Sequence, residues 1–350
     1  YDGPPLSRSH IGIQLHLHGE DIPALVAQLR ALNVGWVKVQ VSWKLFQPEP
    51  NRFDEAWFQE VDKLVTAARE NDMQVMLGVA KAPEWSRPTT EMDGPPSNPQ
   101  HFADFMSLLA TRYSGQVAVY ELWNETNLQR EWNGAPLNGA ALVNLIAVGS
   151  QAVKTADPAA LVLSGAPAPT GINDGLTAVD DRVYFQQMVD AGVAQWVDGF
   201  GIHPYGWGNP PLSTAANPDP IALSHNNHPS FFFLDTLNDY HAILQTAGID
   251  TTAKQLWPTE FGWGTFENIG EPVAGTEFMN YVSEWQQAEY ILAALAFGEQ
   301  TEWVGPMLLW NLNFAPTLGT DFSESGYSIL RPDQTERPIY GALRYALAEG

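Results

Sequence analysis

Two glutamates, Glu125 and Glu260, have residue types and settings that fit one shared chemistry. Glu125 ends the run YELWNE, and Glu260 ends the run LWPTE. Each run is strand-like and largely apolar, and each gives way to a loop after its glutamate. If both strands belong to one barrel, the two carboxyl groups can meet across its mouth. Facing carboxylates are the groups that break glycosidic bonds in most glycoside hydrolases.

Such a reaction needs one protonated and one ionised carboxyl group. The protonated group hands its proton to the leaving oxygen, and the ionised group attacks the anomeric carbon. The two groups lie about 5–5.5 Å apart in retaining enzymes and about 6.5–9.5 Å apart in inverting ones. Repulsion between two close carboxylates helps to keep one proton on the acid. The sequence predicts the pair but not the distance.

A third glutamate, Glu121, lies on the same strand face as Glu125, because side chains alternate along a strand. Its position is deeper in the predicted barrel, so we expect it to be buried and structural. Lys38, on the second predicted strand, is its expected partner, since alternate strands contribute to one interior layer of a barrel.

Short apolar strands alternate with amphipathic helices along the whole chain. Asp54 and the pair Asn98-Pro99 are helix-start signals. The predicted strands are His10–Leu17, Trp36–Val41, Gln74–Val79, Val117–Asn124, Leu161–Ser164, Val197–Ile202, Gln255–Thr259 and Pro306–Trp310. The predicted helices are Asp21–Leu32, one after Asp54, one from Asn98 to about Tyr113, Ala140–Thr155, Asp181–Ala191, about Phe231–Thr246, about Ser283–Phe297 and Pro338–Ala348.

Eight strand–helix units predict a single (β/α)8 TIM barrel domain over residues 1–350. An open doubly wound sheet is the alternative, but no Gly-rich phosphate turn follows the first strand. The longest connections, Pro204–Ser230, Gly262–Val282 and Asn311–Arg337, follow strands six, seven and eight. They therefore belong to the catalytic face of a barrel, and we expect them to shape a substrate cleft.

The composition is strongly acidic, with 17 Lys+Arg against 40 Asp+Glu and a formal charge of −23. Such a field repels nucleic acid and anionic membranes, and it disfavours a strongly anionic polymer unless a local basic pocket overrides it. The absence of Cys excludes disulfides and thiolate metal sites. No apolar run approaches the roughly 20 residues of a membrane span.

The chain begins at Tyr1 rather than Met, which we interpret as a mature or trimmed form that has lost a signal peptide. We therefore expect an extracellular or periplasmic protein, with a cytoplasmic location left open. We also expect a monomer.

Four segments resemble clan A of the glycoside hydrolases. ELWNETN at 121–127 is similar to the clan's strand-four signature, and TEFGW at 259–263 to its strand-seven nucleophile segment. HPY at 203–205 resembles its strand-six segment, and Trp310 its strand-eight tryptophan. The resemblance covers nearly the whole chain. Within the clan, the chain is most similar to family 39 and its bacterial exopolysaccharide-hydrolase relatives, with family 5 next.

The resemblance implies a retaining double displacement without a cofactor. Glu125 would be the acid/base and Glu260 the nucleophile. Asn124 would bond the sugar 2-hydroxyl, an interaction that strengthens in the transition state. Tyr205 would donate a hydrogen bond to Glu260, and His203 would bond the substrate or the carboxylate network.

Two further positions follow from the same resemblance. Trp310 would form the floor of the subsite for the attacked sugar. Lys38 departs from the pattern, because it stands where clan members often carry Arg, and Lys lacks the bidentate fork of Arg. Either Lys38 acts as a point charge or the nucleophile is steadied by other groups.

Aromatic residues after the strands form a second pattern. Each one is balanced between core packing and sugar stacking, but as a group at one barrel end they favour a carbohydrate cleft. They are Trp43, Trp85, Trp132, Trp207 and Trp263, after strands two, three, four, six and seven.

Other polar residues carry weaker signals. His16 and His18 alternate on strand one at a metal-like spacing, but no third ligand is evident, so we predict no metal and expect them to line the pocket. Lys81 and Glu84 follow strand three, either as solvated loop residues or as partners of sugar hydroxyls.

The sequence therefore predicts a retaining glycoside hydrolase that acts on β-linked oligo- or polysaccharides. Endo action is favoured because the tryptophans spread over several loops, and exo action is the alternative. Two other classes stay open: a barrel that binds carbohydrate without catalysis, and a metal-dependent barrel hydrolase that uses His16 and His18. The sugar itself is not specified by the sequence.

Overall fold

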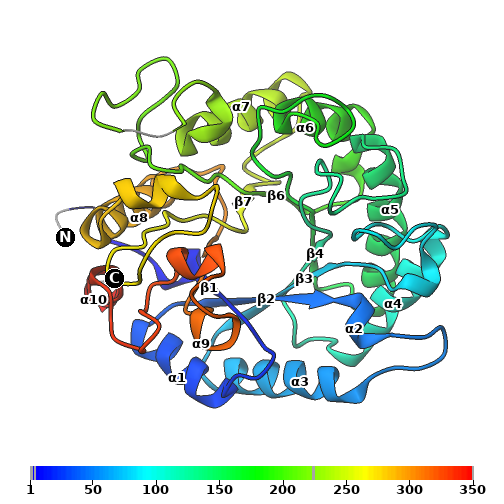
Figure 1. Ribbon diagram of the computed structural model, residues 1–350. Coiled ribbons are helices and arrows are strands. Elements are labelled where there is room, and N and C mark those ends of the chain that lie inside the picture. The colour runs from blue at the N-terminus through cyan, green and yellow to red at the C-terminus, as the bar shows by residue number, and fades with distance from the viewer. Residues whose placement is uncertain (1–2, 4, 223–224, 349–350) are drawn as a thin grey trace.

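The computed structural model describes residues 3, 5–222 and 225–348. Eight parallel strands lie in the order β7-β6-β5-β4-β3-β2-β1-β8 (Figure 1). Parallel bridges Leu256–Val304 and Phe261–Leu309 link the two end strands. The predicted (β/α)8 barrel is thus confirmed. The strands are β1 Ile11–Leu15, β2 Trp36–Ser42, β3 Gln74–Ala80, β4 Val119–Leu122, β5 Leu161–Ser164, β6 Gly199–Ile202, β7 Leu256–Pro258 and β8 Met307–Leu309.

Eight longer helices surround the strands as an outer ring (Figure 1). They are α1 Ile22–Leu32, α3 Glu55–Glu70, α4 Pro99–Arg112, α5 Gly139–Ala156, α6 Asp181–Asp190, α7 Phe233–Thr246, α8 Glu284–Glu299 and α10 Pro338–Ala348. The short helices α2 Trp43–Phe46 and α9 Ala315–Leu318 were not predicted, because four residues are too few to show a helical period. The 3-10 turns are Arg8–His10, Glu84–Ser86, Val193–Gln195, Pro229–Phe231, Glu277–Tyr281 and Ser323–Tyr327.

The helix-start signals in the sequence act as capping residues. The Asp54 carboxylate accepts a hydrogen bond from the Ala56 amide at 3.1 Å, and Asn98 accepts one from the Gln100 amide at 3.1 Å. Each bond satisfies an amide that has no partner within the first helical turn. These caps fix where α3 and α4 begin.

Strand β4 is shorter than predicted. Trp123 and Glu125 adopt left-handed backbone conformations, with φ of 81° and 45°. This conformation cannot continue a β-ladder, so the strand ends at Leu122. Trp123 and Glu125 therefore belong to a turn rather than to the strand.

The barrel interior is filled in layers. One layer is apolar, and above it Lys38 and Glu121 form an ion pair at 2.8 Å with both side chains at most 2% exposed. Gly201 leaves room for this pair, because a Cβ there would lie 2.6 Å from a Glu121 oxygen. The expected Lys38–Glu121 pairing is confirmed. The apolar layer consists of Trp36, Met76, Val119, Leu163, Trp257 and Leu308.

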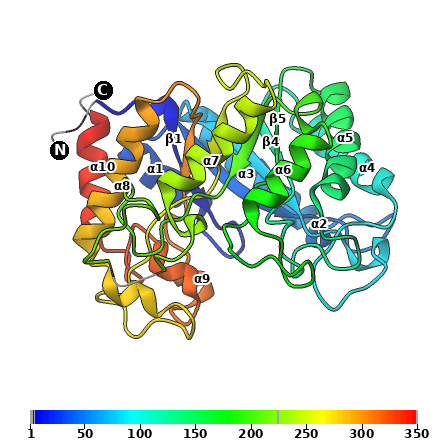
Figure 2. The ribbon, with the colours of Figure 1, turned by 90° about the horizontal axis from the view of Figure 1, so that it is seen from above.

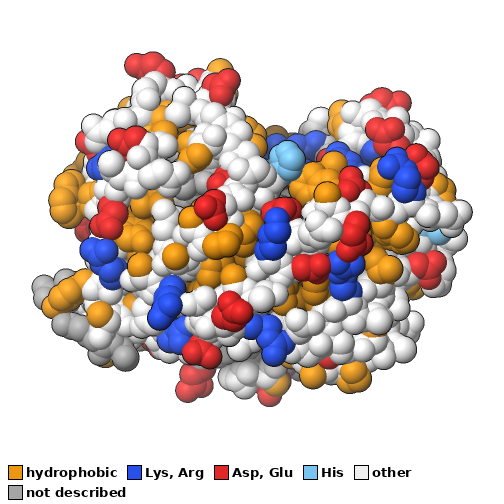
Figure 3. All heavy atoms as spheres, turned by 90° about the horizontal axis from the view of Figure 1, so that it is seen from below, with side chains coloured by type: hydrophobic (Ala, Val, Ile, Leu, Met, Phe, Trp, Pro, Cys, Tyr) orange, Lys and Arg blue, Asp and Glu red, His pale blue; other side chains and the backbone are white. Residues whose placement is uncertain are grey.

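The loops after the strands gather on one face of the barrel. Helices α2 and α9, which follow β2 and β8, both lie in the lower half of the view in Figure 2. In the space-filling view of Figure 3 this face forms the upper edge, and it is hollowed between two raised lobes. Within the described ranges, no helix has the length and hydropathy needed to cross a membrane.

Candidate active site

A cavity of about 870 Å³ opens at the carboxyl ends of the strands. This volume falls within the range of small-molecule and sugar sites, about 300–1,000 Å³. Both Glu125 and Glu260 line it. The other residues named from the sequence that line it are His16, His18, Lys81, Asn124, Tyr205, Trp207 and Trp310.

The two glutamates face each other across one imidazole. His203 Nδ1 lies 3.1 Å from Glu125 Oε1 and 3.7 Å from Glu260 Oε2. The two carboxylate oxygens are therefore at most about 7 Å apart, the sum of those distances. The barrel brings together two residues far apart in the sequence, and this upper limit admits the separation of about 5–5.5 Å found in retaining enzymes.

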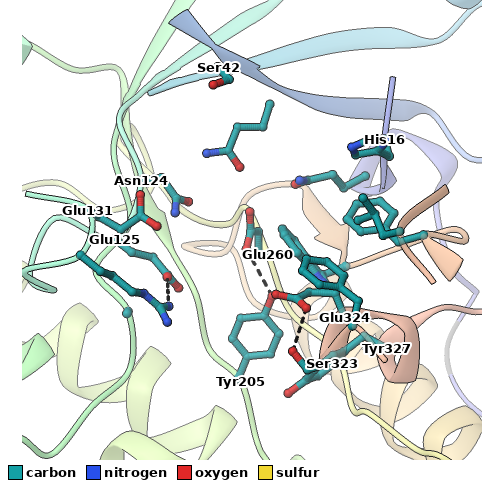
Figure 4. Close-up of a pocket in the computed structure, with 18 of the residues that line it drawn as sticks. His16, Ser42, Asn124, Glu125, Glu131, Tyr205, Glu260, Ser323, Glu324 and Tyr327 are labelled. Atoms are coloured by element: carbon teal, nitrogen blue, oxygen red, sulfur yellow. Dashed lines mark hydrogen bonds and ion pairs between the residues drawn. The ribbon is translucent and has the colours of Figure 1, made fainter. Parts of the chain in front are cut away.

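Glu260 is held by several donors. The Lys38 ammonium lies 3.3 Å from its Oε1, and the Tyr205 hydroxyl donates to its Oε2 at 3.3 Å (Figure 4). Lys38 also donates to the Thr259 carbonyl at 3.1 Å, which fixes the ammonium beside the carboxylate. Burial and the Glu260 charge raise the pKa of Tyr205 well above its usual value, so Tyr205 stays a donor. Lys38 thus supplies a point charge where an Arg was expected.

Glu125 lies nearer the solvent than Glu260, with 15% of its side chain exposed against 5%. Besides His203, it contacts Arg130, whose guanidinium lies 3.2 Å from Oε2 and whose side chain is 68% exposed. Burial acts to raise the pKa of Glu125, but the hydrogen bond and charge of His203, together with Arg130, leave that pKa lowered.

The pKa values of Glu260 and His203 are shifted by burial and by neighbouring charges. Burial raises the pKa of Glu260, against His203 and Lys38, which act to lower it. Burial acts to lower the pKa of His203, but Glu260 and Glu125 leave it raised. Because His203 contacts both carboxylates, the site titrates as a coupled unit rather than as separate residues.

Three residues that line this cavity have left-handed backbone conformations. They are Lys81, Glu125 and Trp207, with φ of 63°, 45° and 49°. A left-handed conformation is unfavourable for residues with a large side chain, and it persists where the surrounding structure enforces it, often at functional sites. The turns after β3, β4 and β6 therefore present their side chains to the cavity at a cost in backbone energy.

A family model described as cellulase (glycosyl hydrolase family 5) matches residues 5–296. The chain belongs to glycosyl hydrolase family 5. This is a retaining family of glycoside hydrolases, and membership implies a carbohydrate substrate. The predicted clan is confirmed, and family 5 is the one that the sequence placed second to family 39. No curated protein matches the chain significantly.

Solved structures agree with the fold. A family 39 glycoside hydrolase from Bacteroides cellulosilyticus superposes with a TM-score of 0.70 at 17% identity, covering 98% of this chain and 64% of its own. The exo-β-1,4-mannosidase Op5Man5 from an Opitutaceae bacterium superposes with a TM-score of 0.63 at 16% identity, covering 99% of this chain and 60% of the mannosidase. A triple mutant of an endo-β-1,4-glucanase from Xanthomonas axonopodis pv. citri gives 0.61 at 12%, covering 98% and 100%.

At these identities the neighbours establish the fold alone. The family 5 chain spans less than two thirds of the length of two of these neighbours, the family 39 enzyme and the mannosidase.

Four tryptophans of the family 5 chain do not line the cavity, contrary to the sequence interpretation. The Trp43 ring is fully buried and stacks on Phe105 with ring centroids 5.3 Å apart. Trp263 is also fully buried, and its indole N–H donates to the Asn209 carbonyl at 2.8 Å. These rings are part of the packing that anchors the loops.

The same correction applies to Trp85 and Trp132. The Trp85 indole N–H donates to the Gln47 carbonyl at 2.9 Å, and that of Trp132 to the Pro136 carbonyl at 3.1 Å. These bonds hold both indoles against the protein, and neither ring lines the cavity. Of the five tryptophans that follow strands, only Trp207 lines the cavity. Glu84, which follows β3, is exposed and lies outside the cavity.

Trp310 and His16 lie where the sequence placed them. Trp310 lines the cavity and packs edge-to-face on Phe314 with ring centroids 5.3 Å apart. The His16 ring also packs edge-to-face on Phe314, with ring centroids 5.6 Å apart, and burial, against Glu20, lowers the pKa of His16. Among the described residues, no group of three or more His, Cys, Asp or Glu side chains could hold a metal ion.

Sequence reasoning missed several residues of the cavity wall. Gln40 and Ser42 share a strand face with Lys38 on β2 and lie nearer the strand's carboxyl end. The strand period alone would therefore have placed them at the barrel mouth. The others lie on loops or at a helix start, where no period gives a side-chain direction. They include Trp57, Arg130, Glu131, Glu324 and Tyr327.

Proposed function

We propose that this family 5 chain hydrolyses β-glycosidic bonds with net retention, through a covalent glycosyl–Glu260 intermediate. The observation that carries the proposal is the placement of both carboxylates within 4 Å of His203 Nδ1, at the base of an open cavity. The proposal needs no cofactor, because nucleophile and acid are both supplied by side chains.

The surroundings of the two glutamates support different roles. Glu260 is the deeper one, and Lys38 and Tyr205 donate hydrogen bonds to it. The charges of His203 and Lys38 act against the burial that raises the pKa of Glu260, and so support its ionised form as the nucleophile. Glu125 lies nearer the rim, where a leaving group departs into solvent. We therefore assign Glu260 as nucleophile and Glu125 as acid/base.

Arg130 explains how Glu125 gains the proton that an acid needs. His203 and, to a smaller extent, Arg130 lower the pKa of Glu125 and favour its ionised form. Arg130 is mostly exposed, so a leaving group that enters beside Glu125 can displace it. Losing this charge and the neighbouring water raises the pKa of Glu125 toward the value of a proton donor.

Two residues position the sugar that is attacked. Asn124 lies beside Glu125 on the cavity wall (Figure 4) and is assigned to the 2-hydroxyl. Trp310 offers an aromatic surface on which a sugar ring stacks.

We further propose endo action on a β-1,4-linked glucan or mannan. The hollow between two lobes in Figure 3 supports a chain lying across the site. One structural neighbour is an endo-β-1,4-glucanase and another an exo-β-1,4-mannosidase, so both sugars are tested first. Endo action predicts a rapid fall in polymer viscosity before much reducing sugar forms, whereas exo action releases one short product from the start.

The nucleophile assignment is tested with Glu260→Ala. This variant should lose at least about 10⁴-fold in kcat, because no group remains to form the intermediate. Added azide should partly restore turnover of an aryl β-glycoside and give an α-glycosyl azide, identified by NMR. NMR of the native reaction should show the β-anomer first. Normal rates in Glu260→Ala would exclude this mechanism.

The acid assignment is tested with Glu125→Ala. Aryl glycosides with activated leaving groups need little protonation, so they should be affected far less than oligosaccharides. An equal loss on both kinds of substrate would contradict the acid role. A native protein that binds oligosaccharides but never cleaves them would instead favour the non-catalytic barrel.

A further inference from the structure

Glu131, in the loop after β4, lines the cavity, and its carboxylate forms no hydrogen bond with any residue that the structure describes. Its Oε2 is buried and has no hydrogen-bond partner among the described residues. Figure 4 shows the carboxylate beside Asn124, on the same wall as Glu125. The backbone is fixed on both sides of the residue, since its amide donates to the Leu128 carbonyl at 3.1 Å and its carbonyl accepts from the Trp123 indole at 3.3 Å.

The charges around Glu131 are already engaged elsewhere. Lys81 lies 3.7 Å from Asp93, which also binds Lys44 at 2.6 Å. The Arg130 guanidinium pairs with Glu125 at 3.2 Å, and Glu125 also contacts His203 at 3.1 Å. Glu131 therefore feels two cations and two anions at a distance but forms an ion pair with none of them.

Burial is the largest influence on this carboxyl group and raises the pKa of Glu131 to about 7. Lys81 and Arg130 act to lower that pKa, whereas Glu125 and Asp93 act to raise it. A buried carboxylate oxygen without a donor destabilises a fold, and such groups are retained where a ligand supplies the missing donor. Glu131 lines the cavity, so a ligand bound there can supply a donor to its carboxylate.

We propose that ionised Glu131 is a substrate-binding residue that accepts hydrogen bonds from hydroxyl groups of the sugar beside the scissile bond. The inference rests on the proposed function for the identity of the ligand. Sugar hydroxyls suit the site because they are neutral donors that enter in adjacent pairs beside a carboxylate that lines the cavity.

Binding by the ionised form has a consequence for pH. At pH 5 Glu131 is protonated and resembles a glutamine, but at pH 8.5 it is a charged acceptor. A Glu131→Gln substitution should therefore do little to sugar affinity at pH 5. At pH 8.5 it should weaken affinity on the order of tenfold, the effect of losing a charged hydrogen bond.

The test is calorimetric titration with cellopentaose, mannopentaose, xylopentaose and laminaripentaose at pH 5, 7 and 8.5. Three proteins are compared, and all carry Glu260→Gln so that no sugar is consumed. The second also carries Glu131→Gln. The third carries Glu84→Gln instead and is the matched control, because Glu84 follows β3 but is exposed and outside the cavity. The control should show no change in affinity at any pH.

The quantity that decides is the loss of sugar affinity that Glu131→Gln causes at each pH. Three results would overturn the inference: a loss that does not change with pH, a loss that is largest at pH 5, or no binding of any of the four sugars. Failure of the proposed function looks different. In that case the native protein binds a sugar with the expected pH-dependent effect of Glu131→Gln, but it hydrolyses neither that sugar nor its polymer.

Discussion

A single buried lysine contacts both the carboxylate inside the barrel and the proposed nucleophile. Lys38 lies between Glu121 at 2.8 Å and Glu260 at 3.3 Å, with 1% of its side chain exposed. Burial acts to lower the pKa of Lys38, but the two carboxylates leave it raised, so the ammonium stays charged. One cation thereby neutralises a structural carboxylate and steadies the nucleophile.

Removing this cation should affect stability and catalysis separately. Lys38→Met leaves two buried carboxylates unpaired, so we expect a loss of about 3–5 kcal/mol in the free energy of unfolding and a large fall in kcat. The double variant Lys38→Met/Glu121→Gln should recover most of the stability, because only Glu260 then lacks its cation. Urea unfolding and kcat are measured for both. Recovery of activity in the double variant would show that Lys38 is structural only.

Glu131 predicts a pH dependence of stability with a definite sign. Its pKa is about 7 in the folded protein, against a usual value of 4.5. The folded state therefore holds this proton more tightly, and stability falls as pH rises from about 4.5 to 7. Glu131→Gln removes that loss. Its free energy of unfolding should match the native value at pH 4 and exceed it by roughly 3 kcal/mol at pH 8. A difference that is constant over urea unfolding at pH 4, 6 and 8 would contradict the raised pKa.

At the scale of elements, the loops around the cavity are held by buried polar groups. Asp181, at the start of α6, is fully buried and accepts hydrogen bonds from the Thr170 amide at 3.1 Å, the Ser230 hydroxyl at 2.5 Å and the Tyr240 hydroxyl at 3.1 Å. It therefore joins the loop after β5 to the segment before α7 and to α7 itself.

Asp181→Ala should leave these three donors without an acceptor, at a cost of about 3 kcal/mol in the free energy of unfolding. Hydrogen exchange should speed up in residues 165–180 and 225–232 before it does so in the strands. Asp190→Ala, an exposed position at the end of the same helix, is the control and should change neither quantity. Equal exchange rates in the two variants would mean that the loops are held in another way.

Elements were predicted better than the loops that join them. The period of apolar residues and the caps at Asp54 and Asn98 placed every strand and long helix, because both signals are local. The direction of a loop side chain is not local. Trp43 and Trp207 each follow a strand, yet the first stacks inside the protein and the second lines the cavity.

At the scale of the whole molecule, the charge of −23 means that the folded chain repels itself. Salt screens this repulsion, so raising NaCl from 10 to 150 mM at pH 7 should raise the melting temperature by a few degrees. The same titration at pH 4.5, where the sequence is near its isoelectric point, is the control and should give a much smaller change. Equal changes at both pH values would show that salt acts in another way.

The sequence by itself determined the barrel, the two glutamates and the elements that carry them, because strand period, capping residues and the motifs around Glu125 and Glu260 are written in neighbouring residues. Only the tertiary structure decided their chemistry. The meeting of both carboxylates at His203, the contact of Lys38 with Glu260 and the place of Glu131 on the cavity wall join residues from different strands and loops. Their distances depend on barrel closure, which no local pattern encodes.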